Sequence, residues 1–347
     1  MALTHFTGFE GFSTAQWTRR GYLASQYTQE QIGTSYGRNG SQGLYAPLDG
    51  YPCKIPTRTT NDTIILGCAF RRSSASGTSD DRTFIQFWDS ASNLHAELKY
   101  KNAGPYLQWY NASGTALGGT WTPISDTWYY LEIQIKIHDT TGTLDMYVDG
   151  VSVISASGLD TKNGSEGYVT YVGLGGSGYH IIHFDDLYIA DTTGSAPYNT
   201  YLGDCRVKTV TPAADDSVQF TPDSGTNVGS INDVVGGGVP DDDATFNWSS
   251  TVGHKDLFTS SGYSDPSPAG PILAVNVIAV AGLDSGSRSL AAIAKKGSSA
   301  QQTGTALALT TSYAEASLLL TQDPETAAAW ADAAAINALK MGYEVTA

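Results

Sequence analysis

The sequence predicts an all-β protein made of two β-sandwich domains, the second carrying one short helix. The 347 residues include 38 Gly, 20 Tyr and 7 Trp, and only 15% of them are charged. Tyr and Trp favour strands, and glycine favours the turns between them. At roughly 100 to 200 residues per domain, the length indicates two domains. We divide the chain into residues 1–197 and 198–347.

Short strands follow one another through the first 200 residues. Apolar and polar residues alternate in several of them, which predicts one buried face for each strand. The clearest case is residues 128–137, where Leu131, Ile133 and Ile135 point one way and Glu132 and Gln134 the other. Further strands are expected at residues 63–71, 82–89, 94–100 and 106–110.

A tight hairpin is expected directly after this strand. Asp149 and Gly150 separate two apolar stretches, residues 143–148 and 151–154. Asp-Gly supplies the positive φ angles that a two-residue hairpin turn needs. The pairing of these two strands is therefore fixed by the turn.

These residues resemble the concanavalin-A-like, laminin-G-type jelly roll. The resemblance rests on the strand at 128–137, on the Gly-x-Leu-x-x-Tyr-Val-Asp-Gly hairpin at 142–150 and on the segment His183-Phe184-Asp185-Asp186-Leu187-Tyr188-Ile189. It covers most of residues 1–192. It implies a two-sheet jelly roll in which the opening segments, around Phe9 and Leu44, return beside the closing strand.

A small, polar segment at residues 190–203 is expected to link the domains. Beyond it, strands are expected at 205–210, 272–283, 288–295 and 312–320. Residues 326–339 are Ala-rich and follow Asp323-Pro324-Glu325, a pattern typical of a helix start. Gly342 then ends this predicted helix before a last short strand at 343–345.

The second half is similar to uncharacterised structural proteins encoded by tailed bacteriophages. The residues that carry this are the segment 184–189, Tyr201-Leu202-Gly203-Asp204-Cys205-Arg206-Val207, Pro240-Asp241-Asp242-Asp243, Asp323-Pro324-Glu325-Thr326 with Trp330, and Ile336-Asn337-Ala338-Leu339. The resemblance implies a virion protein and no catalytic residue. Trimeric homo-oligomers are expected because virion appendages sit on symmetric mounts.

Composition argues against several partners. With 19 Lys and Arg against 34 Asp and Glu, the net charge is −15, which disfavours nucleic acid. No basic, apolar leader opens the chain, and no apolar stretch approaches the ~20 residues of a membrane-spanning helix. The three cysteines, Cys53, Cys68 and Cys205, have no metal-ligand spacing and are expected to be free thiols.

No catalytic residue is predicted. Retaining glycan hydrolysis needs two carboxyl groups about 5 Å apart. Glu132 alternates with Gln134 and Lys136, so its strand supplies no second acid, and Asp149 belongs to the turn.

Acidic clusters are the candidates for a cation. Asp185 and Asp186, and the triplet Asp241, Asp242 and Asp243, offer the oxygen ligands that Ca²⁺ prefers. The alternatives are an exposed acidic loop for the triplet and ordinary strand positions for the pair. No cofactor is predicted, with calcium left open.

Aromatic rings are the candidates for glycan binding. The candidates for exposed aromatic residues are Trp88, Trp109, Tyr110, Trp121, Trp128, Tyr106 and Tyr179. Such rings stack on sugars but also fill sandwich cores. We select Trp121, in a turn-like context, and Trp109 as glycan-binding candidates.

The leading hypothesis is a non-enzymatic protein on the outer surface of a tailed phage, made in the host cytoplasm and associated with the tail. Its jelly roll would face host-surface glycans, and its second domain would dock to other virion proteins. A head-decoration protein attached to the capsid is one alternative, and a soluble carbohydrate-binding protein or glycan hydrolase is another.

Overall fold

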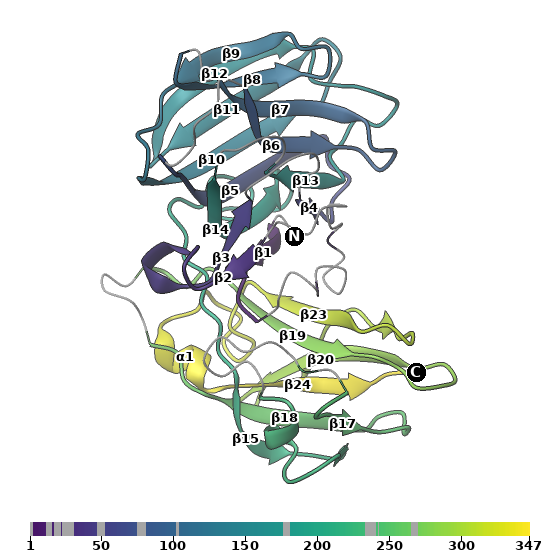
Figure 1. The fold of residues 1–347 in the computed structure, drawn as a ribbon. Helices are drawn as coiled ribbons and strands as arrows, with labels where there is room; N and C mark the ends of the chain where they lie inside the picture. Colours follow the sequence, from purple (N-terminus) through teal and green to yellow (C-terminus); the bar gives the residue numbers. More distant parts are fainter. Residues whose placement is uncertain are drawn as a thin grey trace. The chain divides into compact units, whose positions relative to one another are not determined.

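The computed structural model describes residues 3–11, 16, 22, 31–46, 53–74, 81–101, 104–175, 181–232, 241, 243–264 and 270–347. The predicted all-β class is confirmed. The chain forms two compact units, Met1–Lys208 and Thr209–Ala347, each with its own sheets (Figure 1). Two of the candidate residues named above, Asp242 and Tyr179, lie outside the described residues.

The first unit is a sandwich of two antiparallel sheets. One has eight described strands in the order β12-β11-β10-β5-β14-β3-β2, with β1 paired to β14. These strands are β1 (Leu3–Thr7), β2 (Gln31–Gly33), β3 (Gly43–Ala46), β5 (Thr63–Arg72), β10 (Trp128–Lys136), β11 (Gly142–Val148), β12 (Val151–Leu159) and β14 (Ile182–Asp191). The return of the opening strands beside the closing strand is confirmed, since β1 and β3 both pair with β14.

The second sheet has six described strands in the order β4-β13-β6-β7-β8-β9. They are β4 (Cys53–Pro56), β6 (Arg82–Trp88), β7 (Leu94–Lys101), β8 (Tyr106–Asn111), β9 (Ala116–Trp121) and β13 (Tyr171–Leu174). Core and outer-face residues alternate along most of these strands, and the exception is β6, where Phe84 and Ile85 both lie in the core beside a register shift.

One apolar core lies between the two sheets. From the eight-stranded sheet it receives Leu131, Ile133 and Ile135, all fully buried, so the predicted buried face of β10 is confirmed. The hairpin is confirmed as well: Asp149 and Gly150 have φ of 49° and 76°, and β11 pairs with β12. The three cysteines are free, with Cys53 and Cys68 in the core.

The second unit contains a sheet in the order β15-β18-β24-β20-β21, with β22 paired to β20. Two further pairs are β19-β23 and β16-β17. The strands are β15 (Pro212–Ser217), β16 (Thr221–Pro222), β17 (Asn247–Trp248), β18 (Lys255–Ser260), β19 (Val275–Ala281), β20 (Ser289–Lys296), β21 (Gln302–Thr303), β22 (Leu307–Ala308), β23 (Ala314–Leu320) and β24 (Leu339–Val345). A smaller core joins β19, β20 and β23.

The long helix predicted at residues 326–339 is wrong. The helix α1 covers only Ala333–Asn337, with the Asp332 carboxylate accepting from the Ala335 amide as its N-cap. Upstream, Ala327 has a φ of 55° and Trp330 forms a bridge to Ile272, so this stretch is irregular. Alanine propensity is a weak signal that tertiary packing overrides.

The last strand is longer than predicted because Gly342 lies inside β24 instead of ending a helix. A Cβ at Gly342 would lie 1.8 Å from the Asp256 carbonyl oxygen on the neighbouring strand. Glycine here permits close pairing of β18 with β24, which is one of the uses of glycine within strands.

The strand predicted at residues 205–210 is also absent. Residues 201–207, here called the strap, run without secondary structure and pack on the first unit. The first compact unit therefore extends to Lys208, beyond the sequence-based boundary at residue 197. Among the described residues, no helix is long and apolar enough to cross a membrane.

Candidate functional site

The outer face of the eight-stranded sheet is covered by the strap. On this face Tyr188 lies over β5, where a Cβ at Gly67 would approach its ring to 2.0 Å. The Tyr188 hydroxyl donates to Glu132 Oε1 at 2.5 Å, and the Gly203 amide donates to the same oxygen at 2.8 Å. Glu132 is only 4% exposed. Its carboxylate thus holds the strap in place.

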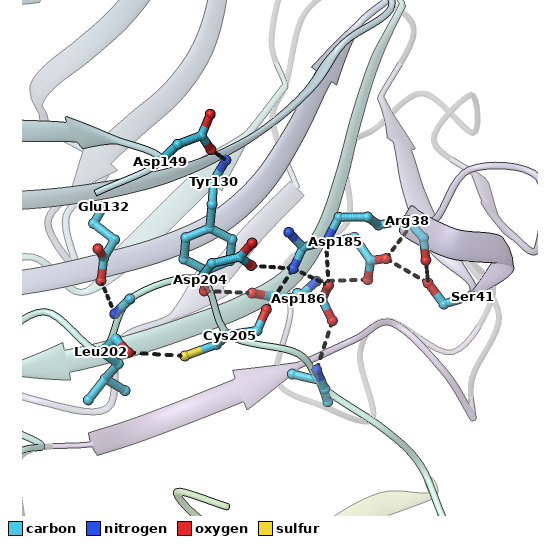
Figure 2. Close-up of polar contacts among 12 residues, drawn as sticks. Arg38, Ser41, Tyr130, Glu132, Asp149, Asp185, Asp186, Leu202, Asp204 and Cys205 are labelled. Carbon is cyan, nitrogen blue, oxygen red and sulfur yellow. Dashed lines mark hydrogen bonds and ion pairs between the residues drawn. The ribbon is translucent and has the colours of Figure 1, made fainter. Parts of the chain in front are cut away.

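Arg38 anchors the other end of the strap. Its guanidinium contacts Asp186 at 2.8 Å and Asp204 at 2.7 Å, and donates to the Cys205 carbonyl at 2.7 Å. Figure 2 shows Arg38 among these groups, with Leu202 further along the strap and Glu132 of β10 beside it. The Val207 amide donates to Asp186 Oδ1 at 2.7 Å. The strap is therefore fixed by buried charge at both of its ends.

Asp185 and Asp186, predicted as calcium ligands, belong to this cluster. Asp186 has a φ of 49° at a bulge in the β14–β5 pairing, and such bulges redirect side chains. Asp185 accepts from the Arg38 amide and the Ser41 hydroxyl, both at 2.7 Å. Burial, together with the charge of Asp186, raises the pKa of Asp185 to about 6. The groups that surround these carboxylates are an arginine, a serine hydroxyl and backbone amides. They take the place that a calcium ion would have in the predicted site.

The predicted acidic triplet does not form a cluster in its described part. Asp241 accepts from the Thr245 amide at 3.0 Å, whereas Asp243 accepts from the Tyr313 hydroxyl at 2.6 Å. Both are exposed. Throughout the described residues, no group of three or more His, Cys, Asp or Glu side chains is arranged to hold a metal ion.

The two tryptophans selected from the sequence both face the core side. Trp109 is fully buried and stacks on Phe87 with ring centroids 5.4 Å apart, so the glycan role predicted for it is wrong. A ring without exposed surface cannot stack on a sugar. Trp121 is half-buried and packs edge-on against Tyr129, with the centroids 4.9 Å apart.

A different set of residues meets on the outer face of the six-stranded sheet. Lys54, Gly173, Gln86, Glu97 and Tyr110 are directly opposite one another across five strands, and we call them the polar row. Gly173 contributes no side chain. Trp88 lies two residues beyond Gln86 on β6 and so shares its face.

Cations lie over two aromatic rings of this face, those of Trp88 and Tyr110. Lys54 Nζ is 4.0 Å from the centre of the Trp88 ring, and Lys99 Nζ is 5.6 Å from that of Tyr110. Ammonium groups at such distances are attracted to the ring face. Burial lowers the pKa of Lys54, while Asp89 acts in the opposite direction.

Glu97 is the carboxylate in the middle of the row. Its Oε1 pairs with Lys99 Nζ at 2.6 Å, and its Oε2 accepts from the Thr83 hydroxyl at 3.1 Å. No second carboxyl group belongs to the polar row. The two-carboxylate arrangement of glycoside hydrolysis is therefore not present in the row.

Two buried polar atoms on this face have no hydrogen-bond partner within the described part of the chain. They are Gln86 Oε1, an acceptor, and Trp88 Nε1, a donor. More than nine in ten buried polar groups in proteins are paired, so each of these two atoms lacks a partner that it would normally have.

No known protein family matches the chain, and no curated protein does. Solved structures with a similar fold include the cellulose-induced protein Cip1, at 16% identity over 55% of this chain and 95% of that one, with a TM-score of 0.41. A Bacillus subtilis protein of unknown function with a galectin-like fold is 11% identical over 55% and 96% of the two chains, with a TM-score of 0.39. The catalytic domain of a Coprinopsis cinerea glycoside hydrolase of family 131 is 17% identical over 58% and 88%, with a TM-score of 0.36.

Proposed function

We propose that this protein binds glycans, without hydrolysing them, through the outer face of its six-stranded sheet. The observation that carries the proposal is the placement of two half-buried aromatic rings, Trp88 and Tyr110, beside the hydrogen-bonding side chains of the polar row. The rings are on strands two apart and are offset by two residues along the strands, which separates their backbones by roughly 12 Å. Sugars present apolar faces to rings and hydroxyls to polar groups.

The unpartnered atoms support the same proposal. A sugar hydroxyl both donates and accepts, so it can pair with Trp88 Nε1 and with Gln86 Oε1 once these side chains turn toward it. Leaving such groups unpaired costs about 1 to 3 kcal/mol each, which a bound sugar would recover.

A glycan array with two tryptophan variants tests this proposal. Trp88→Ala is expected to lose binding, whereas Trp128→Ala is expected to keep it. Trp128 is the matched control because it is also half-buried, with Arg71 5.6 Å from its ring centre, but lies on the eight-stranded sheet. Equal binding by both variants, with both folded, would refute the location of the site.

A reducing-sugar assay tests the non-enzymatic part. The wild-type protein is expected to release no sugar from the glycans that it binds. Turnover that disappears in Glu97→Gln would overturn this part, because Glu97 is the carboxylate of the polar row. Glu132, the acidic residue of β10, is buried under the strap, so its replacement would report on stability instead.

We further propose that this glycan-binding unit is displayed on the outer surface of a tailed phage, on the tail. The sequence resemblance described above and the net charge of −15 support this setting. Immunogold electron microscopy with antibody against residues 209–347 tests it. Label on the tail is expected, whereas label over the head would favour the decoration role. A monomer by light scattering would count against both.

A further inference from the structure

The second unit concentrates its few cations in one place. Residues 209–347 contain fifteen Asp and Glu but only five Lys and Arg, namely Lys255, Arg288, Lys295, Lys296 and Lys340. Three of the five line a single cavity of about 260 Å³, together with Asp216, Ser217, Leu257, Gly297 and Gln301. In a strongly acidic unit, an even distribution of lysines would not place three of the five cations around one cavity.

The strand register places two of these lysines against each other. Lys295 on β20 and Lys340 on β24 are directly opposite cross-strand partners. Figure 1 shows β18, β24 and β20 side by side in this sheet. Like charges directly opposite each other destabilise a sheet, so folding gains nothing from this pair.

The carboxylates nearby neutralise only part of this charge. Lys340 is paired with Asp216. Lys255 donates to Gln301 Oε1 at 2.9 Å, and the Gln301 amide in turn donates to Glu344 Oε2 at 2.5 Å. The ammonium group of Lys295 has no hydrogen-bond or ion-pair partner among the residues that the structure describes.

The remaining two cations of the unit have structural roles. Lys296 is buried and paired with Asp323, and Arg288 donates to the Ser250 carbonyl at 3.1 and 3.0 Å. Both side chains are therefore used by contacts within the fold. The three cavity lysines keep N–H donors available for a ligand, most of all Lys295.

We propose that this cavity binds the anionic group, carboxylate or phosphate, of a molecule no larger than a sugar. The volume is slightly below the ~300 Å³ at which drug-sized pockets begin. The lysines supply the charge-assisted donors, and Leu257 supplies an apolar wall. This inference is independent of the glycan face, because it concerns residues of the second unit alone.

Isothermal titration of the full chain tests the inference. Inorganic phosphate and glucuronate are the two anionic probes, with glucose as the neutral control. Binding of either anion without binding of glucose is expected, and the tighter probe identifies the group. Lys295→Gln is expected to weaken that binding about tenfold or more, as the loss of a hydrogen bond to a charged group does.

The matched control is Lys162→Gln, which removes one positive charge from an exposed pair with Asp139 in the first unit. It is expected to leave anion binding unchanged. Thermal melting without ligand separates binding from folding: Lys295→Gln relieves the repulsion from Lys340 and is expected to melt no lower than wild type. Binding of neither anion by the wild type, or equal binding by Lys295→Gln, would overturn the inference.

Discussion

Replacing Arg38 by glutamine tests whether buried charge holds the strap. Arg38 is 6% exposed, and its loss leaves the Asp186 carboxylate, 3% exposed, without the guanidinium that it pairs with, next to the fully buried Asp185. Removing one partner of a buried ion pair costs about 3 to 5 kcal/mol. We expect a loss of this size, a large fraction of the ~5 to 15 kcal/mol that stabilises a domain.

Urea unfolding followed by tryptophan fluorescence measures this loss, since five of the seven tryptophans precede residue 209. The deficit should be larger at pH 8 than at pH 5. Asp185 already has a raised pKa of about 6, so at pH 5 it takes up a proton, which removes its repulsion of the neighbouring Asp186. Lys162→Gln, at an exposed pair, should cost less than about 1 kcal/mol. A loss below ~1 kcal/mol for Arg38→Gln at pH 8 would refute the reasoning.

Three further predictions concern the first unit. Gly67→Ala should lower its stability by about 1 to 3 kcal/mol in chemical unfolding, because the new Cβ overlaps the Tyr188 ring; an unchanged midpoint would contradict this. Burial, and then the charge of Arg71, lower the pKa of His183 from 6.5 to about 4. Folding therefore favours neutral His183, and the stability advantage over His183→Gln should shrink by up to ~3 kcal/mol from pH 6.5 to 4; a pH-independent difference would exclude it. A chain ending at residue 208 should melt higher than one ending at 197, which lacks the strap.

The parts of the fold that sequence predicts are those encoded by neighbouring residues. The alternation in β10 and the Asp149-Gly150 turn specify a half-buried strand and a hairpin, and both are present. The alternation along β8 also predicts the burial of Trp109. It shares a face of β8 with Leu107, whereas Tyr110 shares the opposite face with Gln108, and counting by two would have placed Trp109 in the core.

The strap and the polar row depend on contacts between distant positions. Arg38 reaches Asp186 across 148 residues, and no local pattern marks either as a partner of the other. The polar row joins five strands through the sheet order, which the sequence does not specify. The virion proposal, in contrast, rests on sequence resemblance and net charge, and on no contact within the fold.

The strap also determines how the first unit would respond to mechanical load. Tension applied to the chain at Lys208 would meet the Val207–Asp186 bond first and the Gly203–Glu132 bond only afterwards. Both bonds lead into interior strands, β14 and β10, which are paired on either side. Peeling seven residues releases on the order of 20 Å of chain. A protein attached to a surface under flow would thus extend by stages. The strap would detach before any strand of the sandwich is pulled out of its sheet.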